Sequence, residues 1–542
     1  MCINKNSFSY KFISIFVMMV GLFLLFFLMR YSINFSDEPY QIMNAIDYYQ
    51  NPSTIFSAYI YHIFGNCCGF ELLTMRFLMA IIVIITMIVP ISYFYLERKN
   101  VWEAICVGGF AILLMSGIQQ KTTLVGWDII SNLFLCVSTG LMLVYAKWKR
   151  SIGIAILLGA FIAMATMSRI PNVVIVPIAL WCILLYGGDN LQVKKKIFAF
   201  LLTFVISVLL IIWITYGDVK SYIDAWHEWG VSSEHGLLHM LVIYLKDIRP
   251  PLLLMGLYVL LYLSIYAITR YDIGLYSKKR NFLLGAFWVV LLFSLCYEYE
   301  HINSFTNNLI TSGYLFILIY IWLKSRKNDC FKTIKTELLI VFFCSLVPAI
   351  GSNTGWFKVA NILSIVFLMP KFLPVASKTI KQVLLVFLGA ILLYFPINKA
   401  REMFFDEGLA QCTECLELPN LKGIYTNPAN EEILKMVLEK EKNSSAQDVL
   451  FVGFGRQMFE YVLDCRADYA PHDFFGTIED ENYISATKKY LEKKSTITRV
   501  YIVNRLYMYY SNMDTMLVEL GYSLTDEQSC YRIYEKTNLL SK

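Results

Sequence analysis

Long apolar runs separated by short charged segments dominate the chain. A helix crosses the bilayer core with roughly 20 apolar residues, and about 17 can suffice. Such runs recur thirteen times, and we predict spans at residues 12–29, 72–95, 101–118, 127–146, 151–167, 172–187, 197–215, 250–269, 282–297, 308–323, 337–350, 359–370 and 379–396. Only 16% of the residues are charged, against about 25% in soluble proteins. The pattern predicts an α-helical polytopic membrane protein and excludes a soluble enzyme, a disordered protein and a disulfide-stapled secreted domain.

Lysine and arginine gather on one side of the predicted spans. If the N-terminus lies in the cytoplasm, the inner segments hold 22 of them and the outer segments hold seven: Arg30, Lys121, Arg169, Lys220, Lys246, Arg249 and Lys358. Cytoplasmic loops carry such an excess. We therefore predict a multi-pass protein of the cell (inner) membrane, with a cytoplasmic N-terminus. The basic excess therefore indicates membrane topology; membrane lipids are expected partners, and no nucleic-acid partner is expected.

The chain divides into an apolar front and a soluble back. Residues 1–398 carry a net charge of +12, and residues 399–542 carry −6. In the back half, strand-like runs at 423–425, 449–452, 500–503 and 531–534 alternate with helical patterns at 431–442, 484–494 and 512–520. Such alternation favours a mostly parallel sheet. We predict a transmembrane domain over 1–398 and an extracytoplasmic α/β domain over 399–542, because an odd number of spans places the tail outside.

The first outer loop, residues 30–71, carries an acidic pair. Asp37 and Glu38 precede Pro39, and apolar residues then recur at helical spacing over 42–49 and 54–64. We predict two amphipathic helices on the membrane surface, with the acidic pair at the N-terminus of the first, where the helix dipole favours ionised carboxylates. An ionised carboxylate there can act as a general base or hold a divalent metal. The alternative is that the pair only caps the helix.

Further charged residues lie on the same predicted face of the membrane. Asp128 opens the span at 127–146, and Lys121 lies in the loop before it. Arg169 follows the span at 151–167, where its planar guanidinium can bind phosphate or can snorkel toward lipid headgroups. Reactive groups must converge on one face for chemistry, so these residues are candidates for a common site.

The outer loop at 216–249 contains a histidine pair. His235 and His239 are four residues apart and would share a helix face, which is compatible with a metal site or with proton transfer. The alternative is an interfacial amphipathic segment. Arg249 closes this loop, and Lys358 is the cation of the last internal outer loop. Both can meet a phosphate.

This arrangement resembles the GT-C glycosyltransferases. The resemblance rests on the thirteen spans, on Asp37-Glu38 directly after the first span, on the two surface helices and on the soluble outer tail. The nearest families in layout are the protein O-mannosyltransferases and the bacterial lipid A aminoarabinose transferases. The likeness covers roughly residues 10–396 and is mainly architectural.

The resemblance implies transfer of a sugar from a polyprenyl-phosphate donor to a lipid, glycan or protein acceptor on the outer face, with inversion at the anomeric carbon. Asp37 would be the general base, and Glu38 and Asp128 would orient the acceptor. Four cations would bind the departing phosphate: Arg169, Lys121, Arg249 and Lys358. The family's divalent metal, where one is used, would be held by residues among Asp37, Asp128, His235 and His239.

Two other classes of protein suit many spans. The first is a transporter or flippase of lipid-linked glycans, although transporters place binding groups near the bilayer midplane and the ionisable residues here gather at one face. The second is a glycan polymerase or ligase, which carries its large loop late in the membrane domain. Sugar release from a radiolabelled polyprenyl-phosphate donor by the purified protein would separate these classes from a transferase.

The charge asymmetry makes a prediction about topology. A reporter enzyme that is active only outside the cytoplasm, fused after Lys542, is expected to be active, because the positive-inside rule places the C-terminus outside. The same reporter fused at the N-terminus serves as the control and is expected to be silent. A silent C-terminal fusion with intact expression would show that the number of spans is even.

Overall fold

The computed structural model describes residues 8–35, 37–118, 125–229, 237–270, 277–299, 305–326, 331–350, 360–403, 406–442, 448–464, 481–504, 511–528 and 531–537. The chain forms two compact units. The first comprises Met1–Met29, Asn51–Tyr59 and Phe77–Arg401, and the second comprises Arg30–Gln50, Ile60–Arg76 and Glu402–Lys542. The soluble tail therefore packs together with most of the first outer loop, which the sequence analysis assigns to the transmembrane domain.

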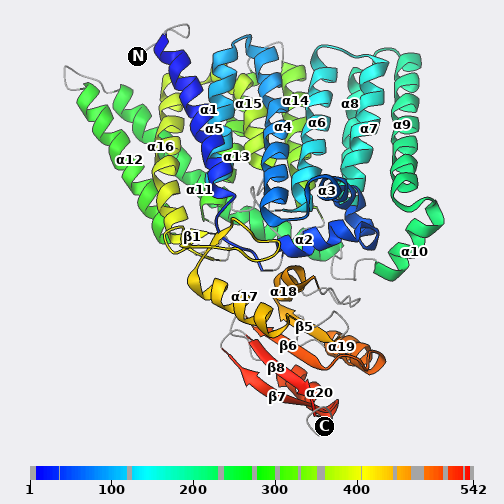
Figure 1. The fold of residues 1–542 in the computed structure, drawn as a ribbon. Coiled ribbons are helices and arrows are strands. Elements are labelled where there is room, and N and C mark those ends of the chain that lie inside the picture. Colours follow the sequence, from blue (N-terminus) through cyan, green and yellow to red (C-terminus); the bar gives the residue numbers. More distant parts are fainter. Residues whose placement is uncertain are drawn as a thin grey trace. The chain divides into compact units, whose positions relative to one another are not determined.

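Each of the thirteen predicted spans coincides with a helix, and Figure 1 shows these helices. They are α1 (Phe8–Leu28), α4 (Leu72–Arg98), α5 (Val101–Ile118), α6 (Trp127–Lys147), α7 (Ile152–Ser168), α8 (Ile175–Tyr186), α9 (Asn190–Tyr216), α11 (Leu237–Arg270), α12 (Ser277–Tyr299), α13 (Phe305–Ser325), α14 (Phe331–Leu346), α15 (Ala360–Val375) and α16 (Lys378–Arg401). Within the part of the chain that the structure describes, six are long and apolar enough to cross a membrane, and further apolar helices are shorter. The protein is an α-helical polytopic membrane protein.

The first unit is a bundle in which neighbours in space are often distant in sequence. Helix α1 packs on α5, α7 on both α6 and α9, α11 on α13, and α12 on α16. Large apolar side chains on α9 stay exposed, among them Phe198, Ile206 and Trp213. Such a surface is stable in lipid but not in water, which agrees with a membrane location for the bundle.

A partly buried ionic network joins four helices of the bundle. Lys147 of α6 lies 2.5 Å from Glu97 of α4, and Lys371 of α15 lies 2.8 Å from Glu97 and 2.5 Å from Glu337 of α14. Tyr93 donates a hydrogen bond to Glu97 at 3.1 Å. Charges inside a protein must be paired, and here two lysines neutralise two glutamates.

The first outer loop forms the two predicted helices, α2 (Asp37–Ile46) and α3 (Ile55–Cys68). Between them lie the short 3-10 helices η1 (Tyr48–Gln50) and η2 (Pro52–Thr54). A further amphipathic helix, α10 (Val219–Trp229), follows α9. The prediction of two helices in the first loop is confirmed.

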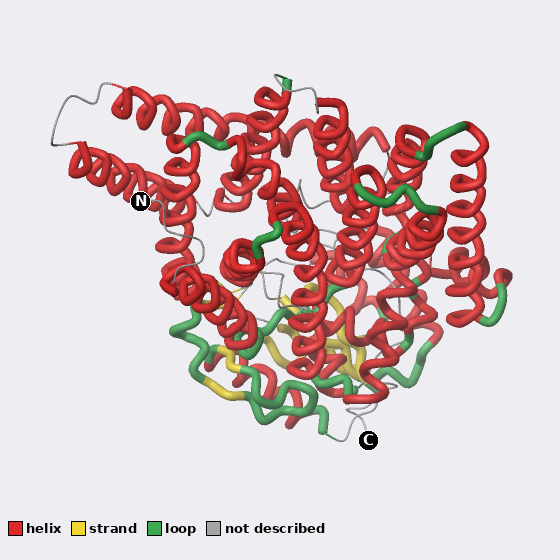
Figure 2. Tube along the Cα trace, turned by 90° about the horizontal axis from the view of Figure 1, so that it is seen from above, coloured by secondary structure: helices red, strands yellow, loops and turns green. Residues whose placement is uncertain are grey.

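The tail contains a four-stranded sheet with the order β5-β6-β8-β7. Its strands are β5 (Val449–Phe454), β6 (Arg499–Asn504), β7 (Tyr522–Glu527) and β8 (Tyr531–Lys536). Strands are yellow in Figure 2. Three of the tail's helices are α17 (Pro428–Lys440), α19 (Glu481–Lys493) and α20 (Ser511–Glu519), at the predicted positions. A fourth, α18 (Arg456–Leu463), follows β5 and was not predicted.

The expectation of a mostly parallel sheet is wrong. Only β5 and β6 pair in parallel, and β8 is antiparallel to both β6 and β7. The reason is the short connection between β7 and β8, because parallel neighbours require a long crossover whereas a short connection makes a hairpin. The predicted strand at 423–425 corresponds to β4 (Tyr425–Thr426), which pairs with β3 (Glu414–Cys415) in a separate two-stranded sheet; β1 (Glu402–Met403) and β2 (Asp406–Glu407) form another.

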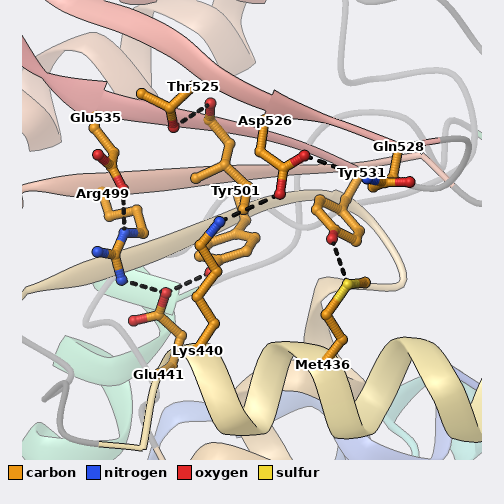
Figure 3. A network of polar contacts seen from close by, with 11 residues as sticks. Met436, Lys440, Glu441, Arg499, Tyr501, Thr525, Asp526, Gln528, Tyr531 and Glu535 are labelled. Atoms are coloured by element: carbon orange, nitrogen blue, oxygen red, sulfur yellow. Dashed lines mark hydrogen bonds and ion pairs between the residues drawn. The ribbon is translucent and has the colours of Figure 1, made fainter.

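A polar network fastens α17 to the sheet, as Figure 3 shows. Glu441, just after α17, is buried and accepts hydrogen bonds from Tyr501 of β6 and from Arg499 at 2.5 Å. Arg499 also donates to Glu535 of β8 at 3.0 Å. Burial, and next the hydrogen bond to the Glu441 carboxylate, raise the pKa of Tyr501. The phenol therefore stays protonated and acts as a donor.

Candidate functional site

The acidic pair opens α2, as predicted. The Asn34 side-chain oxygen accepts a hydrogen bond from the Asp37 backbone N–H at 3.1 Å, so it caps the helix. A short polar side chain that meets the free N–H groups of a first turn stabilises a helix start. The Asp37 side chain is exposed. Its carboxylate therefore lies at the positive end of the helix dipole and is accessible to a reactant.

Glu38, the next residue, is completely buried and is held by one arginine. Arg76, in the first turns of α4, donates from Nε to Glu38 Oε1 at 2.8 Å and from Nη2 to Oε2 at 2.5 Å. The same guanidinium donates to the Ser32 carbonyl at 2.9 Å and to the Tyr31 carbonyl at 3.3 Å. This bidentate pairing is the geometry that guanidinium and carboxylate groups favour.

The two neighbouring carboxylates therefore have different surroundings. Both oxygens of Glu38 accept hydrogen bonds from a buried cation, whereas the Asp37 carboxylate is on the surface. A general base must reach the proton that it removes, and Asp37 meets this condition better than Glu38. Sequence reasoning missed Arg76. The signal was present, because an arginine just inside an apolar span requires an acidic partner.

In the first unit, Arg169 directly follows α7 and is only 4% exposed. Its guanidinium carbon lies 4.9 Å from the centre of the Trp127 ring. Its Nη1 donates to the Pro348 carbonyl at 3.0 Å, in the 3-10 helix η5 (Val347–Ala349), with the Val347 carbonyl at 3.5 Å. The side chain is thus fixed by carbonyl dipoles and an aromatic face. A snorkelling side chain would extend toward the headgroups instead.

Hydrogen bonds from two small polar residues fix the backbone around Arg169. The Ser57 hydroxyl lies 3.3 Å from the Trp127 carbonyl and 3.2 Å from the Ser168 carbonyl, so it links α3 to α6 and α7. Asn172, in the 3-10 helix η4 (Ile170–Val174), donates to the Ser131 hydroxyl at 2.7 Å and to the Ala165 carbonyl at 2.8 Å. The position of Arg169 is therefore set by several elements.

Asp128, another predicted site residue, is partly exposed. It follows Trp127, the residue on which Arg169 stacks, and its Oδ1 lies so close to Gly126 that a β-carbon added there would be 2.6 Å away. Asp128 is thus the sequence neighbour of the residue whose ring holds Arg169, and both residues belong to the first unit. Asp37 and Glu38 belong to the second unit. We call the residues Trp127, Asp128, Arg169, Val347 and Pro348 the arginine cluster.

The other predicted site residues are only partly covered by the structure. Lys121, His235 and Lys358 lie outside the described residues, and for His239 only the backbone, in α11, is described. Arg249, also in α11, is exposed. Among the described residues, no three His, Cys, Asp or Glu side chains gather in a way that could hold a metal ion.

The solved structures that are similar to this chain include those of two proteins. The oligosaccharyltransferase of Archaeoglobus fulgidus matches in its apo form with a TM-score of 0.52 and 11% identity, over 98% of this chain and 75% of that one. The structure of the same protein in complex with zinc and sulfate matches with a TM-score of 0.50 and 12% identity, over 96% of this chain and 73% of that one. ArnT from Cupriavidus metallidurans matches with a TM-score of 0.48 in the apo state and of 0.45 with undecaprenyl phosphate bound. In both cases the identity is 10%, over 97% of this chain and 98% of that one.

The chain has the GT-C fold. The likeness to the oligosaccharyltransferase extends over nearly the whole chain, and at this level of identity it establishes the fold alone. Fold does not determine activity, which depends on the residues of the site. No family model matches the chain, and no curated protein matches it in sequence.

The buried ion pair makes a prediction about stability. Replacing Arg76 by Ala leaves the Glu38 carboxylate buried without its cation, which typically costs about 3–5 kcal/mol. The double variant Arg76→Met, Glu38→Leu removes both charges and is expected to recover much of that loss. The measurement is denaturant and thermal unfolding of the purified protein.

The matched control is the exposed pair Lys422–Glu417, whose charged atoms are 4.0 Å apart. Lys422→Ala is expected to change the unfolding temperature very little, because surface ion pairs contribute little. If Arg76→Ala had an effect as small as that of Lys422→Ala, the Glu38–Arg76 pair would not hold this part of the protein together.

Proposed function

We propose that the protein is a membrane glycosyltransferase that transfers a sugar from a polyprenyl-phosphate donor to an acceptor on the outer face of the membrane. The observation that carries the proposal is the exposed Asp37 carboxylate at the start of α2, directly after the first span of a GT-C fold. The reaction is a single displacement with inversion at the anomeric carbon. The acceptor is a hydroxyl or similar group on a lipid, glycan or protein.

Asp37 acts as the general base. Its exposure at the start of α2 allows an acceptor hydroxyl to approach. As the acceptor oxygen attacks the anomeric carbon, the carboxylate takes the hydroxyl proton and the bond to the donor phosphate breaks. Glu38 supports this role indirectly, because its pairing with Arg76 holds the first turn of α2 in place.

Arg169 stabilises the departing phosphate. The carbonyl groups of η5 and the ring of Trp127 hold the guanidinium in position, so no reorganisation is needed when negative charge develops on the leaving group. Preorganised charge of this kind is a major source of rate enhancement. Asp128, a member of the arginine cluster, orients the acceptor. Lys121, Arg249 and Lys358 are further candidates for phosphate contact.

Cations stacked on aromatic rings support the proposed orientation in the membrane. Among the described residues, seven such pairs involve cations that the charge pattern assigns to the cytoplasmic side: Lys11–Trp102, Lys99–Tyr95, Lys147–Trp148, Arg150–Tyr186, Lys196–Tyr145, Lys324–Tyr320 and Lys335–Trp322. Basic and aromatic side chains concentrate where a membrane protein meets the headgroups. These pairs favour one cytoplasmic interface and leave Asp37, Asp128 and Arg169 to the outer side.

The role of Arg169 predicts an effect on donor binding. Arg169→Ala is expected to reduce affinity for a polyprenyl-phosphate sugar and turnover together, because both depend on the phosphate charge. Arg169→Lys is expected to recover only part of the affinity, because lysine keeps the positive charge but lacks the planar, bidentate donor geometry of arginine. Binding is measured with the folded protein in detergent. Unchanged donor affinity in a folded Arg169→Ala variant would show that Arg169 only ties α7 to η5.

The role of Asp37 predicts an effect on the chemical step. Asp37→Asn keeps the shape of the side chain but cannot accept the proton, and turnover is expected to fall by about 10²–10⁴-fold. Donor affinity is expected to be unchanged. The assay follows transfer of radiolabelled sugar from the lipid donor by purified protein.

Asp47→Asn is the matched control, because Asp47 immediately follows α2 and belongs to the same unit; it is expected to retain activity. Glu38→Gln weakens the pair with Arg76 and is expected to lower stability more than Asp37→Asn does. Full activity of Asp37→Asn, alone and combined with Glu38→Gln, would refute the proposed mechanism.

A further inference from the structure

The short tail helix α18 packs against the first outer loop within the second unit. It lies beside α2, the helix that carries the acidic pair. Seven of its eight residues are buried, including the charged Arg456 and Glu460. The soluble tail therefore contributes directly to the surroundings of the loop that contains Asp37.

Residues of α18 hold the segment immediately before α2. The Met458 backbone N–H donates to the Phe35 carbonyl at 3.1 Å. The rings of Phe459 and Phe35 meet edge to face, with their centres 5.9 Å apart. Phe35 is two residues before Asp37, so these contacts fix where α2 begins.

Tyr461 of α18 holds the other end of the loop. Its hydroxyl is 2.7 Å from the Phe70 carbonyl and 3.2 Å from the Asn420 carbonyl. The Asn420 side chain donates to the Tyr461 carbonyl at 2.8 Å, and the Asn420 carbonyl accepts from the Leu72 N–H at 2.9 Å. Leu72 is the first residue of α4, so Tyr461 and Asn420 together set the start of that helix.

The start of α4 leads directly to the acidic pair. Arg76 lies about one turn after Leu72 and holds both oxygens of Glu38, which is adjacent to Asp37. A shift of the first turn of α4 would therefore move Arg76, then Glu38, and with it the first turn of α2. Tyr461 stands at the beginning of this series of contacts.

The Tyr461 hydroxyl must keep its proton in order to donate to a carbonyl oxygen. Burial, and next the negative charges of Glu38 and Glu71, raise its pKa. The hydroxyl consequently keeps its proton over the physiological pH range and can donate it to the Phe70 carbonyl.

We propose that Tyr461 is a positioning residue for Asp37, and that α18 is the means by which the soluble tail sets the orientation of the helix that carries the general base. The inference rests on the proposed function of Asp37. It assigns a role to the tail itself, which acts through the loop and does not contact the reacting groups.

The test is Tyr461→Phe, which deletes one hydroxyl. Its matched control is Tyr522→Phe, because Tyr522 is equally buried in the same unit and its hydroxyl donates to the Ile497 carbonyl at 2.8 Å, within the sheet region. Both variants are expected to lower the unfolding temperature to a similar extent. Only Tyr461→Phe is expected to reduce kcat, by about 10- to 100-fold because small misplacements of a reacting group have effects of this size, with an unchanged KM for the donor.

Two further readouts separate positioning from general destabilisation. Amide hydrogen exchange in residues 37–46 is expected to accelerate in Tyr461→Phe and not in Tyr522→Phe. In an Asp37→Asn background, Tyr461→Phe is expected to cause little additional loss, because the two residues act on the same step. Equal kcat values for the two Tyr→Phe variants, or a full further loss on top of Asp37→Asn, would overturn the proposal.

The design also distinguishes this inference from the proposed function. Fully active Asp37→Asn would refute the general base regardless of Tyr461, whereas inactive Asp37→Asn with fully active Tyr461→Phe would refute only the positioning role. If Tyr461→Phe fails to fold, Phe459→Leu removes the ring contact with Phe35 and keeps an apolar side chain. That variant is expected to show the same selective loss of kcat, and full activity would contradict the proposal.

Discussion

The ion pair between Glu38 and Arg76 is the interaction on which the acidic loop depends. Separating two such charges in a region from which water is excluded would leave each without solvation, so the bidentate contact is strongly enforced. Arg76 also holds the carbonyls of Tyr31 and Ser32. One guanidinium thereby connects the segment between α1 and α2, the first turn of α2 and the start of α4. The exposed position of Asp37 is a consequence, since successive residues of a helix point about 100° apart.

Charges in the bundle also need compensating partners, and they find them in two different ways. Near the ends of α4 and α6, Glu97, Lys147, Lys371 and Glu337 neutralise one another through direct ion pairs. At the arginine cluster, carbonyl dipoles and the Trp127 ring hold Arg169. A self-neutralised network suits a structural role. A cation held in place by dipoles and a ring keeps its charge, which suits recognition of an anion.

The division of the chain into units gives the soluble tail a defined structural task. Residues 30–50 and 60–76 cluster with the tail, and backbone hydrogen bonds join them at several points, including Ser32 to Tyr425 at 2.8 Å and Tyr425 to Arg30 at 2.7 Å. Stacking of Tyr31 on Tyr425 adds to these bonds. The loop that carries the acidic pair is thus held from both sides of its sequence by a domain that begins more than 300 residues later.

Local patterns in the sequence determined the helices. Apolar runs set the thirteen bundle helices, and the 3.6-residue period with Asp37-Glu38-Pro39 at its start set α2, because these signals act within one segment.

Only the tertiary structure decided the antiparallel pairing of β7 and β8, the contacts of α18 with the loop, and the partners of Glu38 and Arg169. Arg76 lies 38 residues from Glu38, and Pro348 lies 179 residues from Arg169. Contacts at such separations arise from the packing of whole elements, which no local period encodes. The sequence therefore identified Asp37 and Glu38 as candidate site residues, and the fold decided that Glu38 is held by a buried cation while Asp37 remains exposed.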